Sequence, residues 1–207
     1  MKLLVIGSSH VVRLQRYIQT GRIPQLDEHL NLQNKDIHVV WHGKGGARVS
    51  YLKSKIEWIK TINPDLVWLV IGSNDLDDEN LPAQDPAEEV AERIASFAQT
   101  LISCGVKRVF VTPIFSRKTP RRQDFNLLKD HVNRLVFLRL KQLEINSKVV
   151  MTSRVPTEKK QLYEDKYHLC SYGYFLMTIH ATGMVKKYVT ALRKKMQILC
   201  KSVNCCI

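Results

Sequence analysis

The chain has 207 residues, 44% of them apolar and 25% charged, and its 32 Lys and Arg outnumber its 19 Asp and Glu for a formal net charge of +13. This composition excludes an intrinsically disordered chain, and the length is that of one globular domain with a substantial core. The positive charge predicts attraction to polyanions, such as nucleic acid or an anionic membrane surface, and leaves an ordinary soluble basic protein as the alternative.

Targeting and redox features point to the interior of a cell. The apolar run 3–6 before Gly7 is too short for the core of a secretory signal, and no run of 18 apolar residues could form a transmembrane helix. Three of the five cysteines fall in the last eight residues, at Cys200, Cys205 and Cys206. Because such a cluster is not a disulfide framework, we expect free thiols and an intracellular protein, cytoplasmic or nuclear, with no signal peptide.

Apolar runs alternate with helical patterns along the whole chain. The predicted strands are residues 3–6, 37–41, 66–71, 108–112 and 149–152. The predicted helices are at about 11–18, 49–62, 85–104, 124–145 and 171–198. This alternation indicates a three-layer α/β/α fold with a flavodoxin-like, mainly parallel sheet of five strands. We expect a single domain over residues 1–207 that ends in a short basic tail from about residue 199.

Three of these elements carry clear local signals. The apolar run 66–71 is that of a strand buried on both faces, which predicts a central position in the sheet. Asp85 and Pro86 are residue types typical of a helix N-cap and of the first helical position. The helix over 124–145 is predicted to be amphipathic. Its apolar face would consist of Phe125, Leu128, Val132, Leu135, Leu138 and Leu143.

A glycine turn follows each of the first three predicted strands. These turns are Gly7-Ser8-Ser9, Gly45-Gly46 and Gly72-Ser73-Asn74. In a sheet of strand order 2-1-3-4-5 the first strand lies between the second and the third, and ligands bind outside the carboxyl ends of the strands. We therefore expect the three turns to meet over one crevice.

The hydroxyls of Ser8 and Ser9 form a candidate nucleophile site, although a serine at this position can also serve only as the N-cap of the following helix. A hydroxyl nucleophile needs a base, and acyl transfer needs donors aimed at the developing oxyanion. Late in the chain, Asp165 and His168 are three residues apart, so the carboxylate could fix the imidazole tautomer. Taken alone, this pair also fits an ordinary surface loop.

Taken together and in this order, these blocks make the sequence resemble the SGNH (GDSL-type) hydrolase family. The family carries a Ser after the first strand, a Gly after the second, an Asn after the third and a late Asp-x-x-His. Carried over residue by residue, the resemblance implies Ser9 as the nucleophile, His168 as the base and Asp165 as the acid. It also implies an oxyanion hole formed by Ser9, Gly46 and Asn74.

The resemblance extends from residue 3 to about residue 180, and Tyr172-Gly173-Tyr174 continues the family's pattern after the histidine. It implies an α/β/α fold and esterase or acyl-hydrolase chemistry on a small ester or acyl substrate, without a cofactor. One departure is that the family usually has Gly-Asp-Ser where this chain has Gly7-Ser8-Ser9. The chain is most similar to the compact SGNH domains found in open reading frames of animal mobile elements.

Other motifs fit a functional site less well. His38 and His42 are four residues apart on a predicted strand, which offers no helical face to zinc, so we expect no metal site. The acidic residues from Asp75 to Glu79 are interpreted as a solvated loop. Three tryptophans fall in apolar, periodic elements and are expected in the core or at an interface: Trp41, Trp58 and Trp68.

Two clusters of basic residues predict surface patches. The cluster beside the strand at 108–112 contains Lys107, Arg108, Arg117, Lys118, Arg121 and Arg122. The cluster on the last helix contains Lys186, Lys187, Arg193, Lys194 and Lys195. From these patches we expect weak, sequence-independent binding of nucleic acid that decreases with salt.

The sequence therefore leaves three functions open. The first is a serine esterase that uses Ser9, His168 and Asp165. The second is a catalytically silent SGNH-fold module that binds nucleic acid or a protein partner through its basic surface, which the charge and the unusual Ser8 favour. The third is a nucleotide-binding flavodoxin-like domain, for which a Gly-x-x-x-x-Gly-Lys phosphate loop is missing.

Overall fold

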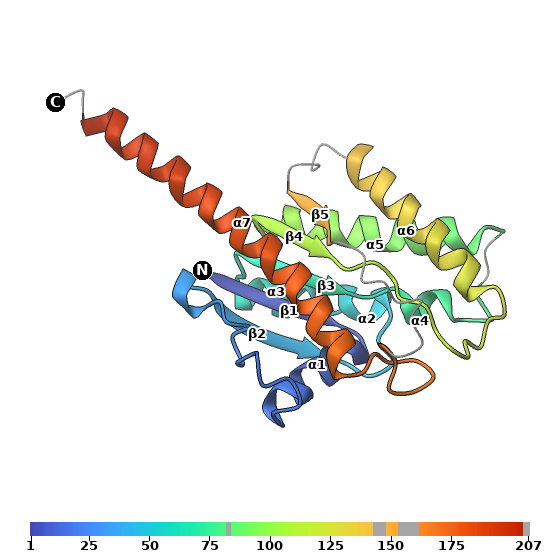
Figure 1. Ribbon diagram of the computed structural model, residues 1–207. Coiled ribbons are helices and arrows are strands. Elements are labelled where there is room, and N and C mark those ends of the chain that lie inside the picture. Colours follow the sequence, from blue (N-terminus) through green and yellow to red (C-terminus); the bar gives the residue numbers. More distant parts are fainter. Residues whose placement is uncertain (82–83, 143–147, 153–161, 205–207) are drawn as a thin grey trace.

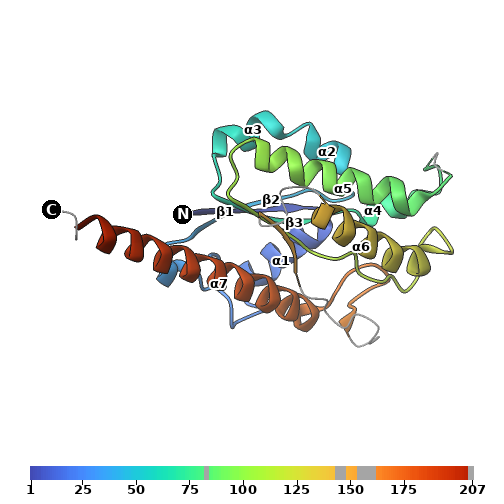
Figure 2. The same cartoon turned by 90° about the horizontal axis from the view of Figure 1, so that it is seen from above.

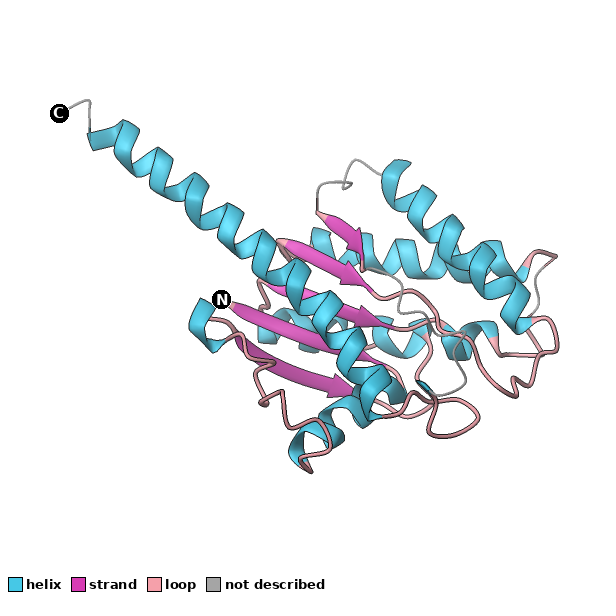
Figure 3. Ribbon diagram, in the orientation of Figure 1, coloured by secondary structure: helices cyan, strands magenta, loops and turns pink. Residues whose placement is uncertain are grey.

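The computed structural model describes residues 1–81, 84–142, 148–152 and 162–204, with side chains to residue 198 (Figure 1). Its centre is a five-stranded sheet of strand order β2-β1-β3-β4-β5, in which every neighbouring pair is parallel. The strands are β1 (Lys2–Gly7), β2 (His38–Gly43), β3 (Leu66–Val70), β4 (Arg108–Val111) and β5 (Val149–Met151). The predicted α/β class and flavodoxin-like strand order are confirmed, and the arrows in Figure 3 all point the same way.

Helices cover both faces of the sheet, as the view from above shows (Figure 2). One face is covered by α2 (Val49–Lys53), α3 (Ile56–Ile62), α5 (Pro86–Ser103) and α6 (Phe125–Gln142). The opposite face is covered by α1 (Ser9–Gln19) and the long α7 (Ser171–Asn204). The carboxyl-terminal part of α7 extends beyond the sheet in both views.

Alternation along the strands supplies two separate apolar cores. In β3 the side chains of Val67 and Leu69 face the α5 side, whereas Leu66, Trp68 and Val70 face the α7 side. All five residues of β3 are buried, so the predicted central position of this strand is confirmed. Both faces of a central parallel strand are covered by helices, which accounts for a run without polar residues.

The helix predicted over residues 49–62 is wrong as a single element, because the structure has α2 and α3 in its place. Ser54, between them, donates its hydroxyl to the carbonyl of Tyr51 at 2.8 Å. Such local hydrogen bonds compete with helical ones, although the apolar spacing continues. The short helix α4 (Ser73–Leu76) was not predicted, because it occupies residues interpreted as a turn.

The predicted ends of the two last helices also need correction. The buried face of α6 contains Phe125, Val132, Val136 and Leu140, whereas Leu138 is 41% exposed and Leu143 lies outside the described residues. The chain around the predicted tail is helical to Asn204, since no Gly or Pro after Gly183 stops the helix. The cap prediction is confirmed, because the Asp85 carboxylate accepts hydrogen bonds from the backbone N–H groups of residues 87 and 88.

Among the described helices, none combines the length and the apolar character needed to cross a membrane.

Candidate active site

The turn after β1 is forced by close approach of two strands. A Cβ atom on Gly7 would lie 2.0 Å from the carbonyl oxygen of Val70 in β3, so no residue with a side chain fits. The backbone N–H of Ser8 donates to that same carbonyl at 3.0 Å. This contact turns the chain into α1 and leaves Ser9 as the first helical residue, at the carboxyl edge of the sheet.

The turn after β2 brings Gly46 to the same edge. The N–H of Ala47 donates to the carbonyl of Lys44 at 3.1 Å, and Gly46 has a φ of +70°. This is the left-handed region, which glycine enters without steric cost. The backbone of the turn thus explains the glycine at position 46.

The turns after β2 and β3 are tied together by hydrogen bonds from two adjacent residues. The Asn74 side chain donates through Nδ2 to the carbonyl of Ala47 at 2.9 Å. The carboxylate of Asp75 accepts from the Val49 N–H at 3.1 and 3.2 Å, and burial raises the pKa of this carboxyl. The interpretation of residues 75–79 as a solvated loop is therefore wrong, because Asp75 and Asp77 are buried.

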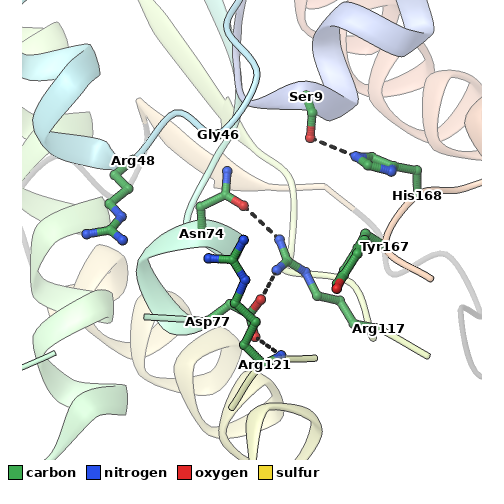
Figure 4. A pocket seen from close by; sticks show the side chains of 9 residues that line it. All are labelled: Ser9, Gly46, Arg48, Asn74, Asp77, Arg117, Arg121, Tyr167 and His168. Atoms are coloured by element: carbon green, nitrogen blue, oxygen red, sulfur yellow. Dashed lines mark hydrogen bonds and ion pairs between the residues drawn. The ribbon is translucent and has the colours of Figure 1, made fainter. Parts of the chain in front are cut away.

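The late Asp-x-x-His block lies against Ser9. His168 Nε2 is 3.0 Å from Ser9 Oγ, and His168 Nδ1 is 2.9 and 3.0 Å from the two carboxylate oxygens of Asp165 (Figure 4 shows Ser9 and His168). The backbone N–H groups of Tyr167 and His168 donate to Asp165 Oδ1, each at 2.7 Å. The three side chains form a continuous hydrogen-bonded chain across 156 residues of sequence between Ser9 and Asp165.

The charges fix how this chain of hydrogen bonds is protonated. Burial alone would raise the pKa of Asp165, but hydrogen bonds from Tyr167 and His168 lower it to about 2. An ionised carboxylate can only accept, so Nδ1 of His168 is the donor and Nε2 of the neutral ring accepts from the Ser9 hydroxyl. Burial lowers the pKa of His168, against the opposing effect of Asp165. A neutral imidazole at neutral pH is the form that can take a proton.

Arg13 holds the acidic end of this chain and was missed in the sequence. Its guanidinium lies 2.9 Å from Asp165 Oδ2 and 3.2 Å from Glu164 Oε2. Arg22 makes a further ion pair with Glu164 at 3.0 Å. The sequence spacing could have indicated Arg13, because Arg13 follows Ser9 by four residues and so shares its helix face.

Arg117 was predicted to lie on a basic surface, and this is wrong. It is 9% exposed and forms an ion pair with the buried Asp77. Its Nη2 also donates to Asn74 Oδ1 at 2.8 Å, and its guanidinium lies over the rings of Phe125 and Tyr167. Arg117 is buried because the loop after β4 folds over the pocket. No local pattern in the sequence indicates this.

The predicted basic patch beside β4 is also divided. Lys107 and Arg108 lie at the amino end of the strand, where Lys107 makes an ion pair of 2.6 Å with Asp65. Arg117 and Arg121 follow the carboxyl end, so they face the opposite edge of the sheet. On α7, Lys187 and the basic residues 193–195 are exposed, as predicted for a surface cluster.

A second histidine lies directly behind His168. The ring of His10 is 5.6 Å from that of His168, and its Nδ1 is 3.0 Å from the hydroxyl of Tyr174. Burial, followed by the charges of His168 and Arg117, lowers the pKa of His10 to about 3. His10 is therefore a neutral, buried contact for the neighbouring ring.

The turns enclose a pocket of about 290 Å³ at the carboxyl edge of the sheet. It is lined by Ser9, Gly46, Arg48, Asn74, Asp77, Arg117, Arg121, Tyr167 and His168 (Figure 4). The structure thus brings Ser9, Gly46, Asn74 and His168 to one cavity, with Asp165 directly behind His168. The described residues contain no group of three or more His, Cys, Asp or Glu side chains that could hold a metal ion.

Comparison with known proteins gives similarity in structure and none in sequence. No family model matches the chain, and no curated protein matches it. A solved structure assigned as an acylhydrolase, from Bacteroides fragilis, superposes with a TM-score of 0.64 at 14% identity, over 91% of this chain and 88% of that one. The chain has the fold of a hydrolase.

Two acetyl xylan esterases share this hydrolase fold. The enzyme from Geobacillus stearothermophilus superposes with a TM-score of 0.56 at 19% identity, over 86% of this chain and 90% of that chain. A second acetyl xylan esterase superposes with a TM-score of 0.60 at 17% identity, over 89% of this chain and all of that chain. At such identities the similarity establishes the fold, and the chemistry has to be argued from the pocket.

Proposed function

We propose that this protein is a serine ester hydrolase of SGNH type, with Ser9 as nucleophile, His168 as general base and Asp165 as the acid that orients it. The observation that carries the proposal is the 3.0 Å contact between Ser9 Oγ and His168 Nε2, with His168 Nδ1 held 2.9 Å from Asp165. A hydroxyl held by a neutral imidazole, itself held by a carboxylate, is the arrangement that activates serine for acyl transfer.

In the acylation step, His168 Nε2 takes the Ser9 proton while Ser9 Oγ attacks the ester carbonyl. The carbonyl electron pair moves onto oxygen, and Asp165 stabilises the imidazolium that forms. When the tetrahedral intermediate collapses, the bond to the alcohol oxygen breaks and His168 returns the proton to that oxygen. Water then repeats the sequence on the acyl-enzyme, which releases the carboxylic acid and restores Ser9.

The oxyanion would be held by donors from the three turns. Ser9 is the first residue of α1, so its backbone N–H has no intrahelical acceptor. Gly46 and the Asn74 amide line the same pocket, and Nδ2 of Asn74 is identified as the donor because Oδ1 accepts from Arg117. Such preorganised donors stabilise the developing charge.

The similar structures support ester chemistry. Serine-to-alanine and aspartate-to-alanine variants of the Geobacillus acetylxylan esterase are both described as catalytic mutants of that enzyme. For the present chain we infer a small ester substrate, because the pocket of about 290 Å³ lies at the lower end of the range for small-molecule sites.

Covalent labelling tests this function. A fluorophosphonate should add to wild-type protein, read by intact mass, and the label should be absent from Ser9→Ala. The same pair should differ in hydrolysis of p-nitrophenyl acetate. Labelling that persists in Ser9→Ala, or that never occurs in the wild type, would exclude Ser9 as an activated nucleophile and favour the catalytically silent module.

Binding of nucleic acid is a second candidate function, at the other edge of the sheet. A cavity of about 620 Å³ lies there, and the basic residues among those lining it are Lys107, Arg108, Lys148 and Lys195. Filter binding of a random single-stranded oligonucleotide should weaken steeply with salt if counterion release drives it. A flat salt dependence would contradict this function and leave the esterase proposal unaffected, since the two sites are separate.

A further inference from the structure

The pocket beside Ser9 contains three arginines, and among the described residues two of them are in ion pairs. Arg117 is paired with Asp77, and Arg48 lies 2.6 Å from Asp78. Among the described residues, the guanidinium of Arg121 makes no ion pair or hydrogen bond, although its backbone N–H donates to Asp77 at 2.9 Å. The acidic groups around the pocket are therefore already engaged.

The backbone of Arg121 is fixed beside the pocket, and its side chain is exposed. Asp77 Oδ1 accepts from the N–H groups of both Arg121 and Arg122, while its other oxygen is bound to Arg117. Figure 4 shows Arg121 among the side chains that line the pocket, together with Arg48, Asn74 and Arg117. Because Arg121 lines the same pocket as Ser9, its charge faces the space where an ester would bind.

We propose that the substrate is a short ester that also carries a carboxylate, which Arg121 binds. This rests on the proposed esterase function. A guanidinium presents a planar fork of donors that matches a carboxylate. Of the three arginines that line the pocket, Arg117 is compensated by Asp77 and Arg48 by Asp78, so the positive charge of Arg121 remains and favours an anionic substrate.

The anion could belong to the acyl part or to the alcohol part, and matched esters distinguish these. Phenyl hydrogen adipate against phenyl adipamate tests the acyl part. The pair 4-acetoxybenzoate and 4-acetoxybenzamide tests the alcohol part. In each pair the charge is replaced by a neutral amide, and the spontaneous rate is subtracted. We expect kcat/KM to favour the anionic member of one pair by about fivefold, the order of a partly exposed ion pair.

Arg121→Gln should reduce this preference to near one, whereas Arg134→Gln should not. Arg134 is exposed on α6 outside the pocket, and its replacement removes the same net charge. A preference that survives Arg121→Gln, or that Arg134→Gln reduces equally, would overturn the proposal, because it would reflect only the overall charge of the protein.

Binding to Ser9→Ala protein separates this proposal from the catalytic one. Phenyl hydrogen adipate or 4-acetoxybenzoate should bind this variant more tightly than its neutral amide, and Arg121→Gln in the same background should remove the difference. If neither anion is preferred in binding or turnover while neutral esters are hydrolysed through Ser9, the anionic substrate is excluded and the esterase remains. If the anions bind through Arg121 without any hydrolysis, the esterase fails and the anion site remains.

Discussion

The two sides of the pocket orient their side chains by different interactions. One side holds Ser9 and His168, and the other holds Asn74. On the first side, Asp165 and His168 come from one short loop, and the backbone of that loop supplies two of the hydrogen bonds to the carboxylate. On the second side, the Asn74 amide is oriented by Arg117, which belongs to a different loop and is held by the buried Asp77.

This difference shows which contacts are specified within a short sequence motif and which depend on distant residues. The Asp-x-x-His spacing already includes the acid, the base and the N–H groups that hold the acid. The orientation of Asn74 depends on a buried ion pair between Asp77, directly after α4, and Arg117 in the loop after β4, two residues 40 positions apart. Four substitutions test the proposed roles on the two sides, in order of decreasing effect.

On the first side, His168→Gln should lower kcat by about 10⁴-fold, because Ser9 loses its base. Hydrolysis of p-nitrophenyl acetate and the rate of fluorophosphonate labelling should both fall. Thermal unfolding should change little, since His168 is a pocket residue on a loop. Retention of more than about a tenth of wild-type kcat would show that Ser9 does not depend on this imidazole.

On the second side, Asn74→Ala should lower kcat by roughly 10²–10³, the loss expected for one oxyanion donor, with little change in KM. Asn80→Ala is the matched control, because Asn80 is exposed and does not line the pocket. If the two variants have equal kcat, the Asn74 amide does not stabilise the reaction.

Arg117→Lys tests how Asn74 is oriented. It should lower kcat by roughly tenfold to a hundredfold, because Asn74 would be misoriented. Lysine retains the charge near Asp77 but cannot bridge Asp77 and Asn74 as a planar guanidinium does. Arg122→Lys, in the same loop and paired with Asp124, serves as control. If Arg117→Lys and Asn74→Ala combine with fully additive free energies, the two residues act independently and this positioning role is wrong.

The smallest effect concerns pH and Arg13. Burial lowers the pKa of His168 below its ordinary value of 6.5, so kcat/KM should fall on the acid side at a pH below 6.5, where the imidazole becomes protonated. Arg13 also lowers this pKa, so Arg13→Gln should raise it and move the acid limb to higher pH. Arg16→Gln, on the exposed side of α1, should leave the limb unchanged.

The sequence predicted the fold class because that class depends on local patterns, and the flavodoxin-like strand order was inferred from the class. A strand buried on both faces has to be apolar throughout, as residues 66–70 are, and an amphipathic helix shows its buried face in its spacing. Predictions failed where tertiary contacts decided which of several apolar residues with helical spacing are buried. Leu138 has the spacing of a core residue, yet α6 turns Val136 and Leu140 inward instead.

The sequence by itself determined which residues lie at the carboxyl edge of the sheet, because a strand followed by a glycine turn ends there whatever covers it. It therefore indicated the turns that contain Ser9, Gly46 and Asn74, whereas Asp165 and His168 were indicated by their spacing and by the resemblance to the SGNH family. Only the tertiary structure decided which charges accompany them. The spacing from Ser9 could have indicated Arg13, but nothing in the sequence around Arg117 distinguishes it from an exposed arginine such as Arg121. Burial against Asp77 makes that distinction, since a charge leaves water only where a partner from elsewhere in the chain compensates it.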